Sequence, residues 1–255
     1  MDNENIYRKI QDFFGNLQDN FSLLEEPVDV NTQMKYFEAS GKLRGSIKEE
    51  DILARKEDLL NPDIPTSEKE TLLVQMAGIP NPEIFRTIEA YVKNPDESLK
   101  EWAQLALQEN KLLLESHLLD RRQVFISTGL GGKGHKLRYF VVLINKEGGD
   151  LQPFQQKIVH DEMEYALNRY NSELEKLNFL VNYTTMRVVV PITSDLTKLF
   201  REGIEECNQF GNFLSDDFIV TNMKELDAGE IKEALEAREN NMEIESEDDD
   251  FPPID

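Results

Sequence analysis

The chain has 255 residues, 39% of them hydrophobic and 31% charged, with a formal net charge of −22. This length allows one large core or two modest ones, and the composition excludes a fully disordered chain. No apolar run approaches the ~20 residues of a membrane span, and the single cysteine, Cys207, excludes an intramolecular disulfide. The start lacks the pattern of a secretory signal, so we expect a cytoplasmic protein that binds no membrane.

The charge is unevenly distributed along the chain. Residues 1–120 contain 13 basic and 24 acidic residues, residues 121–223 contain 12 and 13, and residues 224–255 contain 3 and 13. A strongly acidic surface repels phosphate backbones, so the overall charge disfavours nucleic acid as a partner. The exception is local, because residues 121–138 include five basic residues and no acidic ones: Arg121, Arg122, Lys133, Lys136 and Arg138.

Residues 1–120 have the apolar spacing of helices and are predicted to form one helical domain. Apolar residues recur at three- and four-residue steps over 98–119, which predicts a long amphipathic helix, and 67–99 contains two shorter ones. Further helices are predicted over 4–17, 34–40 and 48–60, with turns at 25–31 and 41–46. Asn-Pro-acid triplets begin at Asn61, Asn81 and Asn94. Each marks a helix start, since Asn can cap a helix and Pro fits its first turn.

Short helices joined by tight Asn-Pro turns make residues 66–119 resemble the HEAT-repeat class of α-solenoids. The triplets are 20 and 13 residues apart, which leaves room for at most two repeat units. An ordinary helical bundle is the alternative. The resemblance implies a surface that binds another protein, and it implies no chemistry.

After residue 120 the pattern changes to that of a mixed domain, predicted to span 121–226. Strands are expected at 123–129 and 137–144, a long helix at 152–178, a strand or a pair of strands at 179–192, a helix at 194–211 and a strand at 216–226. The order β-β-α-β-α-β predicts an α+β domain in which two helices cover one sheet. Residues 227–255 are expected to form an acidic helix, with Asp227 and Glu230 at capping-box spacing, followed by a disordered acidic tail.

A G-x-G-x-x-G pattern occurs at Gly129, Gly131 and Gly134. A dinucleotide site needs a helix to open at the last glycine, but the strand-like residues 137–144 follow. A P-loop needs Lys and then Ser or Thr after Gly134, and the chain has His135 and Lys136 there. The other kinase motifs are also missing. We therefore interpret residues 128–136 as a mobile β-hairpin loop.

This loop has two interpretations. It is either a tolerated flexible connection or a tip that binds an anion or a partner. In the second case, exposed backbone N–H groups and basic side chains would hold a phosphate, a carboxylate or an acidic peptide. The residues of that weak candidate site are Gly129, Gly131, Gly134, Lys133, Lys136 and Arg138.

The sequence contains few other candidates for a metal or catalytic site. His160 and Glu164 are one helical turn apart, but a solvated pair is favoured over a metal site. Cys207 falls on the apolar face of the helix predicted at 194–211, which indicates a buried thiol rather than a nucleophile. We predict no catalytic residue, no cofactor and no metal.

The sequence therefore favours a non-catalytic adaptor that binds another protein, through the helical face or through the basic Gly-rich loop. The first alternative is an α+β domain that binds or processes a small anionic ligand at Lys133, Lys136 and Arg138. The second is nucleic acid binding at the same basic residues, against the long-range repulsion of the acidic chain.

Overall fold

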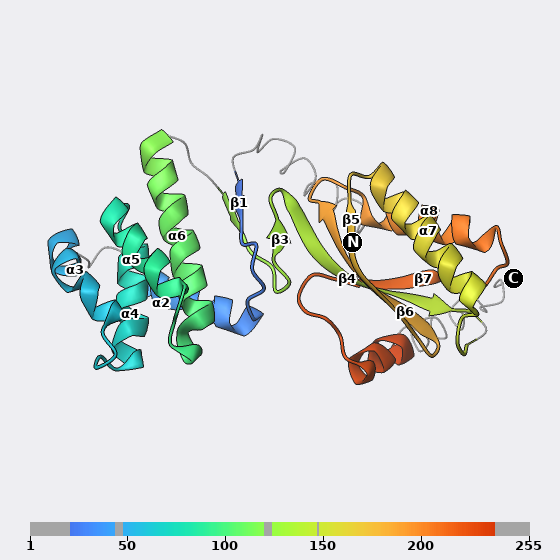
Figure 1. The fold of residues 1–255 in the computed structure, drawn as a ribbon, viewed down its shortest axis with the longest axis horizontal. Coiled ribbons are helices and arrows are strands. Elements are labelled where there is room, and N and C mark those ends of the chain that lie inside the picture. The colour runs from blue at the N-terminus through green and yellow to red at the C-terminus, as the bar shows by residue number, and fades with distance from the viewer. Residues whose placement is uncertain (1–20, 44–47, 120–123, 147, 238–255) are drawn as a thin grey trace, which may run out of the picture.

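The computed structural model of the chain describes residues 21–43, 48–119, 124–146 and 148–237. They form two lobes side by side (Figure 1): a helical lobe, residues 30–119, and a sheet lobe, residues 128–237. The α+β fold predicted from the sequence is confirmed. The predicted helix at 4–17, the acidic tail beyond residue 237 and the predicted domain boundary at 120 all lie outside the described residues.

The helical lobe is built around one apolar core. Its elements are α2 (Val30–Leu43), α3 (Glu49–Arg55), η1 (Lys56–Leu60), α4 (Thr66–Ala77), α5 (Pro82–Val92), η2 (Glu97–Leu99) and α6 (Lys100–Leu119). The side chains fully buried among them include Tyr36, Leu59, Leu72, Leu73, Met76, Ile84, Ile88 and Leu105. Each such side chain stabilises the fold by roughly 1.5–3 kcal/mol relative to its exposure to water.

Buried polar groups tie α6 to its neighbours. The carboxylate of Glu109 accepts hydrogen bonds from the hydroxyls of Tyr36, at 2.6 Å, and Ser40, at 2.9 Å, which joins α6 to α2. The side-chain amide of Asn110 donates to three carbonyls at the end of α4, those of Met76, Ala77 and Ile79. The carbonyls of Met76 and Ile79 also accept from the backbone N–H groups of Ile79 and Asn81, so Asn110 ties α6 to the turn that ends α4.

Only one of the three Asn-Pro-acid triplets starts a helix directly. Asn81 caps α5, because its side chain accepts a hydrogen bond from the backbone N–H of Glu83 at 2.8 Å and Pro82 is the first helical residue. The prediction is wrong for the other two. Asn61 ends η1, and α4 begins later, at Thr66. After Asn94 the next helical turn begins only at Glu97.

The two lobes are joined by a neck of two short parallel strands, β1 (Phe21–Leu23) and β2 (Val124–Ile126), in which Phe21 pairs with Val124. The helical lobe is the connection between these strands, so the chain enters and leaves it at one place (Figure 1). The sequence predicted that β2 would belong to a hairpin with the next strand. Instead β2 pairs with β1, a segment about 100 residues earlier in the chain.

The sheet lobe contains β3 (Gly132–Lys133), β4 (Lys136–Asn145), β5 (Glu173–Leu180), β6 (Tyr183–Pro191) and β7 (Leu214–Thr221). All its pairings are antiparallel, in the order β3-β4-β6-β5, and β7 pairs with β4 beside β3. Helices α7 (Pro153–Arg169) and α8 (Leu196–Asn208) pack on one face. The helical residues 228–237 cover part of the other face, where Ile231 contacts Phe140, Val142 and Ile219.

The prediction of a helix over 152–178 is wrong for its last part, after Arg169. α7 ends at Arg169, Asn171 adopts a positive φ of 53°, and Glu173–Leu180 forms β5. A residue at positive φ breaks the helical backbone, and a second one, Asn182, turns β5 back into β6. The region predicted as one or two strands, 179–192, thus contains the end of β5 and the whole of β6. Within the described ranges, no helix is both long and apolar enough to cross a bilayer.

Candidate functional site

The glycines of the G-x-G-x-x-G pattern lie where three segments of the chain meet. A Cβ atom on Gly129 would lie 1.6 Å from the carbonyl oxygen of Met223, and one on Gly131 would lie 2.3 Å from that of Glu25. Gly131 also has a φ of +66°. These positions require glycine because other backbone passes too close for any side chain. Gly129 and Gly131 therefore serve the close packing of the protein's own chain, whereas a Cβ on Gly134 would meet nothing within 4 Å.

Three backbone N–H groups of this loop donate to other segments of the chain. Gly132 donates to the carbonyl of Glu25 at 3.1 Å, and Gly134 donates to the Glu25 carboxylate at 2.9 Å. Leu130 donates to the carbonyl of Asn222 at 3.0 Å. The loop thus contacts an extended acidic segment that belongs to the same chain. The expected hairpin exists, but only as the tight turn between β3 and β4.

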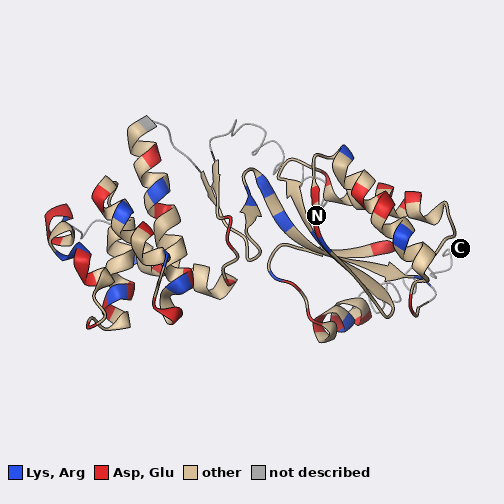
Figure 2. Ribbon diagram, in the orientation of Figure 1, with Lys and Arg blue, Asp and Glu red and all other residues tan. Residues whose placement is uncertain are grey.

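The three basic side chains predicted for the site lie together on β3 and β4 (Figure 2). Lys133 and Lys136 both contact the carboxylate of Glu173, at 2.6 and 2.8 Å. Arg138 forms a bidentate pair with Glu175, at 2.7 and 3.0 Å. All three cations are therefore paired with β5, the strand that the sequence predicted to be helix.

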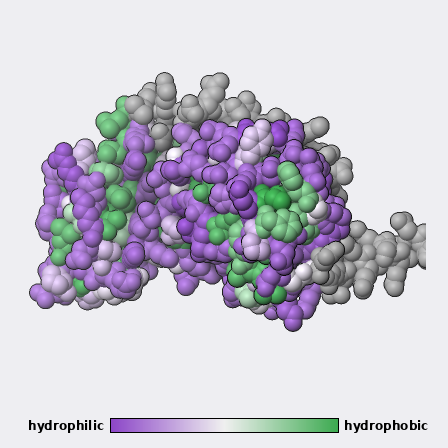
Figure 3. Space-filling view, turned by 45° about the vertical axis from the view of Figure 1, so that its right-hand side comes forward, coloured by the Kyte–Doolittle hydropathy of each residue, from purple (hydrophilic) through white to green (hydrophobic). Residues whose placement is uncertain are grey.

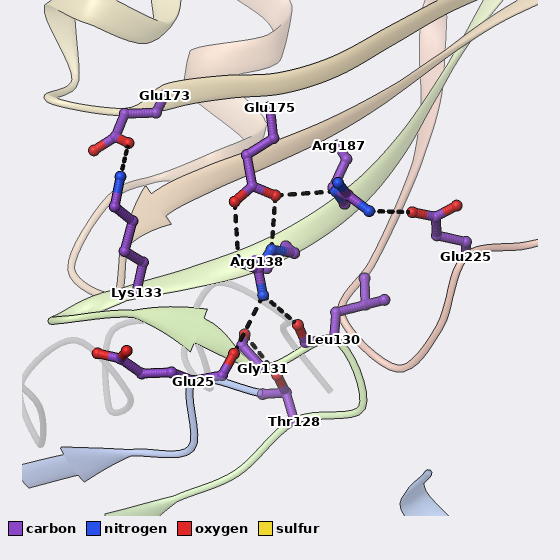
Figure 4. Close-up of polar contacts among 10 residues, drawn as sticks. All are labelled: Glu25, Thr128, Leu130, Gly131, Lys133, Arg138, Glu173, Glu175, Arg187 and Glu225. Atoms are coloured by element: carbon purple, nitrogen blue, oxygen red, sulfur yellow. Dashed lines mark hydrogen bonds and ion pairs between the residues drawn. The ribbon is translucent and has the colours of Figure 1, made fainter. Parts of the chain in front are cut away.

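Arg138 also holds the segment that enters the neck. Its Nη1 donates to the carbonyl of Leu130 at 2.8 Å and to that of Glu25 at 3.3 Å (Figure 4). Arg187 of β6 donates to Glu175 and to Glu225, each at 3.0 Å. The result is a continuous chain of charges that connects β4, β5, β6 and the residues after β7. We call this arrangement, with Glu25 and loop 128–136, the joint.

A cavity of about 540 Å³ lies at the joint, lined by Lys133, Arg138 and Arg187 and by Glu25, Glu26, Glu175 and Glu225. Its four carboxylates outnumber its three cations, so its field does not favour a free anion. The hydrogen bond from Arg138 lowers the pKa of Glu175, and those from Lys133 and Lys136 lower the pKa of Glu173 to about 2. Both carboxylates are ionised at neutral pH.

The remaining candidates from the sequence are accounted for separately. His160 contacts its neighbour Asp161, Nδ1 to Oδ1 at 3.0 Å. In the described part of the chain, no group of three or more His, Cys, Asp or Glu side chains is placed to hold a metal. Cys207 is fully buried, as predicted, and burial raises the pKa of its thiol to about 12. Arg121 and Arg122 lie outside the described residues.

The sequence did not indicate the acidic half of the joint. Glu173 and Glu175 were placed in a predicted helix, where they look like ordinary solvated residues. Their alternation with Leu174 is the strand signal that would have placed them on one face of a sheet. Arg187 lies among the buried residues of β6, where no such alternation is visible. Searches with the full chain match neither a protein-family model nor a curated protein sequence.

Proposed function

We propose that this is a non-catalytic adaptor that binds another protein, and that it does so through the helical lobe. The observation that carries the proposal is an apolar strip on α2. Met34 and Phe37 are 67% and 36% exposed. They are three residues apart, which places them side by side on one helix face. The ring of Phe37 continues the strip to Phe125 of β2, with ring centroids 5.8 Å apart. We call these three residues the α2 strip.

Three further points support this surface over the Gly-rich loop. Exposed apolar residues that adjoin one another mark interaction sites more often than those scattered singly. Figure 3 shows hydrophobic residues at the surface of the helical lobe. The resemblance of residues 66–119 to HEAT-type arrays implies the same use of that lobe. In contrast, a partner that used Lys133, Lys136 or Arg138 would have to displace Glu173 or Glu175. We also propose a cytoplasmic location, which the single cysteine supports.

The test compares two double variants in a pull-down from native cytosol. Met34→Glu with Phe37→Glu places two charges on the α2 strip. The matched control, Phe154→Glu with Phe210→Glu, does the same to residues of the sheet lobe that are 60% and 59% exposed. We expect a partner of the wild-type protein to be lost with the first variant and kept with the second. Thermal melts establish that both variants fold.

The captured protein is then identified by mass spectrometry, purified and titrated against the same three proteins. Binding that is unchanged in the α2 variant refutes the helical lobe as the binding surface. Turnover of the captured protein, or its chemical modification by the wild-type chain, refutes the non-catalytic role.

A further inference from the structure

A cavity of about 290 Å³ lies in the helical lobe, between the end of η1 and the residues that follow α5. The two Asn-Pro-acid triplets that start no helix directly meet there. Pro62 of the first triplet lines the cavity together with Asn94, Pro95 and Asp96 of the second. These triplets therefore contribute to the wall of one cavity, which gives them a structural role other than helix capping.

A buried cation also lines this cavity. The side chain of Lys69 on α4 is 4% exposed, and its ammonium group donates to Oδ2 of Asp96 at 2.8 Å. The same nitrogen lies 5.7 Å from the ring centroid of Tyr91. An ammonium group has three donors, and within the described ranges Asp96 is the one acceptor for this side chain. Lys69 therefore has donors left for a ligand.

The carboxylate of the pair also has bonding capacity left. The side chain of Asp96 is 35% exposed, and its two side-chain donors, Lys69 and the hydroxyl of Tyr91, both bind Oδ2. No other side chain in the described part of the molecule donates to Oδ1. The hydrogen bond from Lys69 holds the pKa of Asp96 below its ordinary value of 3.8, so this carboxylate is charged at neutral pH.

The stability of the fold does not require a charged pair at this place. Burial of two charges costs desolvation energy, and well-packed apolar residues in their place often stabilise a protein as much or more. Lysine is also among the residues least often buried. Because the pair of Lys69 and Asp96 borders a cavity, a ligand explains it better than packing does.

The two charges select the class of ligand. Of the described residues that line the cavity, only Lys69 and Asp96 are charged, so the site favours neither a free anion nor a free cation. A free α-amino acid carries both charges, with its ammonium nitrogen and a carboxylate oxygen about 3 Å apart. The separation of Nζ of Lys69 and Oδ2 of Asp96, 2.8 Å, is similar. The two pairs of charges can therefore lie antiparallel and form charge-assisted hydrogen bonds.

The remaining lining sets the size and the polarity of the ligand. Leu59, Leu60 and Pro62 contribute apolar surface, and Leu60 is 45% exposed. A volume of about 290 Å³ corresponds to roughly ten water molecules. This space admits one amino acid and excludes a nucleotide or a peptide of several residues.

We propose that this cavity binds a free α-amino acid with an apolar side chain. The ligand carboxylate accepts from Lys69, its ammonium group donates to Asp96, and its side chain covers Leu60. The site shares no residue with the α2 strip or the joint, so this proposal and the adaptor role can fail separately.

The experiment is isothermal titration calorimetry of the full-length protein with free leucine, methionine and phenylalanine. We expect saturable binding of at least one of them, with a Kd below about 1 mM. The amide of that amino acid lacks the carboxylate, and its deamino analogue lacks the ammonium group. Each loses one charged contact and should bind at least tenfold more weakly.

Two variants test whether the ligand occupies this cavity. Ala90 is an exposed residue of α5 that lines the cavity, so Ala90→Phe fills it from a surface position. Lys69→Met with Asp96→Asn removes both charges together, so no buried charge is left unpaired. We expect each variant to weaken binding at least tenfold. The matched control is Ala54→Phe, at an exposed position of α3 outside the cavity, and it should stay within about twofold of wild type.

Thermal melts establish that the variants fold, and three outcomes overturn the proposal. The first is the absence of saturable heat with all three amino acids. The second is equal binding of the amide or the deamino analogue, which would show that Lys69 or Asp96 does not contact the ligand. The third is an unchanged affinity in folded Ala90→Phe, which places the ligand elsewhere.

Discussion

The carboxylate of Glu25 accepts a hydrogen bond from the backbone N–H of Gly134 at 2.9 Å, across 109 residues of sequence. The same residue accepts two more through its carbonyl oxygen, from the N–H of Gly132 and from the guanidinium of Arg138. One residue of the entering segment thus accepts from two backbone N–H groups of the Gly-rich loop and from one guanidinium beside it. This contact adds to the pairing of β1 with β2 at the place where the chain enters the helical lobe.

Substitution of two glycines in the same loop distinguishes the energetic cost of a close backbone contact from the cost of a strained φ. Gly131 and Gly134 have nearly the same φ, +66° and +60°, but a Cβ on Gly131 meets backbone at 2.3 Å, whereas one on Gly134 meets nothing within 4 Å. We expect Gly134→Ala to lower the free energy of unfolding by about 1 kcal/mol, the cost of a strained φ. Gly131→Ala should cost roughly 1–3 kcal/mol more, because Glu25 must also move.

Urea denaturation of both variants measures the difference. If the two variants lose equal stability, the close contact between Gly131 and Glu25 adds nothing, and both glycines serve only the local turn.

Removal of Glu175 should weaken the joint more than removal of Glu173. The side chain of Glu175 is 23% exposed and connects Arg138, itself 16% exposed, with Arg187. In the variant Glu175→Gln, two guanidinium groups lose their shared carboxylate. This should lower the free energy of unfolding by about 1–3 kcal/mol. Glu173 is 43% exposed, so solvent screens its pairs and Glu173→Gln should have the smaller effect. Chemical denaturation at neutral pH tests this order, and the reverse order would contradict it.

The stability of the protein should fall in acid, in part through Glu175. Its pKa in the folded state lies below the ordinary value of 4.5, chiefly because Arg138 hydrogen-bonds to it. A carboxyl group with a depressed folded pKa stabilises the fold above its unfolded pKa, and this contribution is lost as the pH falls through the folded pKa. The loss therefore lies below about pH 4.5 for Glu175.

The measurement is the free energy of unfolding of wild type and Glu175→Gln as the pH is lowered from about 6 to about 3. The wild-type curve should fall more steeply than that of the variant. Parallel curves would show that Glu175 has the same pKa in both states.

The elements that could be predicted from the sequence are those whose apolar spacing has one interpretation. Helix α8 buries Leu199, Phe200, Ile204 and Cys207 on one face, and that face is visible as three- and four-residue steps. The prediction for α5 succeeded for the same reason, with Asn81 as an added local signal. Strand β5 was missed because its apolar residues also match the end of a helix pattern. In the structure, Asn171 at positive φ separates helix α7 from strand β5.

The candidate site was harder to predict, because its geometry is not local. The sequence identified Lys133, Lys136 and Arg138 as a basic group beside glycines, and the structure brings them together. It did not identify Glu25, Glu173 or Glu175, which reach them from 37 to 113 residues away. A Gly-rich loop that binds a ligand and one that admits its own chain have the same local sequence, since both need backbone without Cβ atoms.

Asn110 is expected to be a structural requirement of the helical lobe. It is completely buried, and its amide donates to the carbonyls of Met76, Ala77 and Ile79 at 2.7 to 3.3 Å. The variant Asn110→Leu has a similar volume but no donor, so the Ala77 carbonyl loses its side-chain donor, while those of Met76 and Ile79 keep backbone N–H donors. We expect a loss of about 2–4 kcal/mol in the free energy of unfolding. The comparison variant is Gln104→Leu, a substitution of the same kind at a half-buried position of the same helix.

The last prediction separates the adaptor from the small-anion alternative. In the wild-type protein, Glu173 pairs with both Lys133 and Lys136, so isothermal titration with inorganic phosphate should show no saturable heat. The variant Glu173→Gln frees both ammonium groups beside the turn at Gly134 and should gain phosphate binding in the millimolar range, about 4 kcal/mol. Glu202→Gln on α8 removes a carboxylate that pairs with Arg169 and Lys198, not with Lys133 or Lys136, and should gain nothing. Saturable phosphate binding by the wild type would instead favour a small anionic ligand, because it would show that phosphate displaces Glu173 without help.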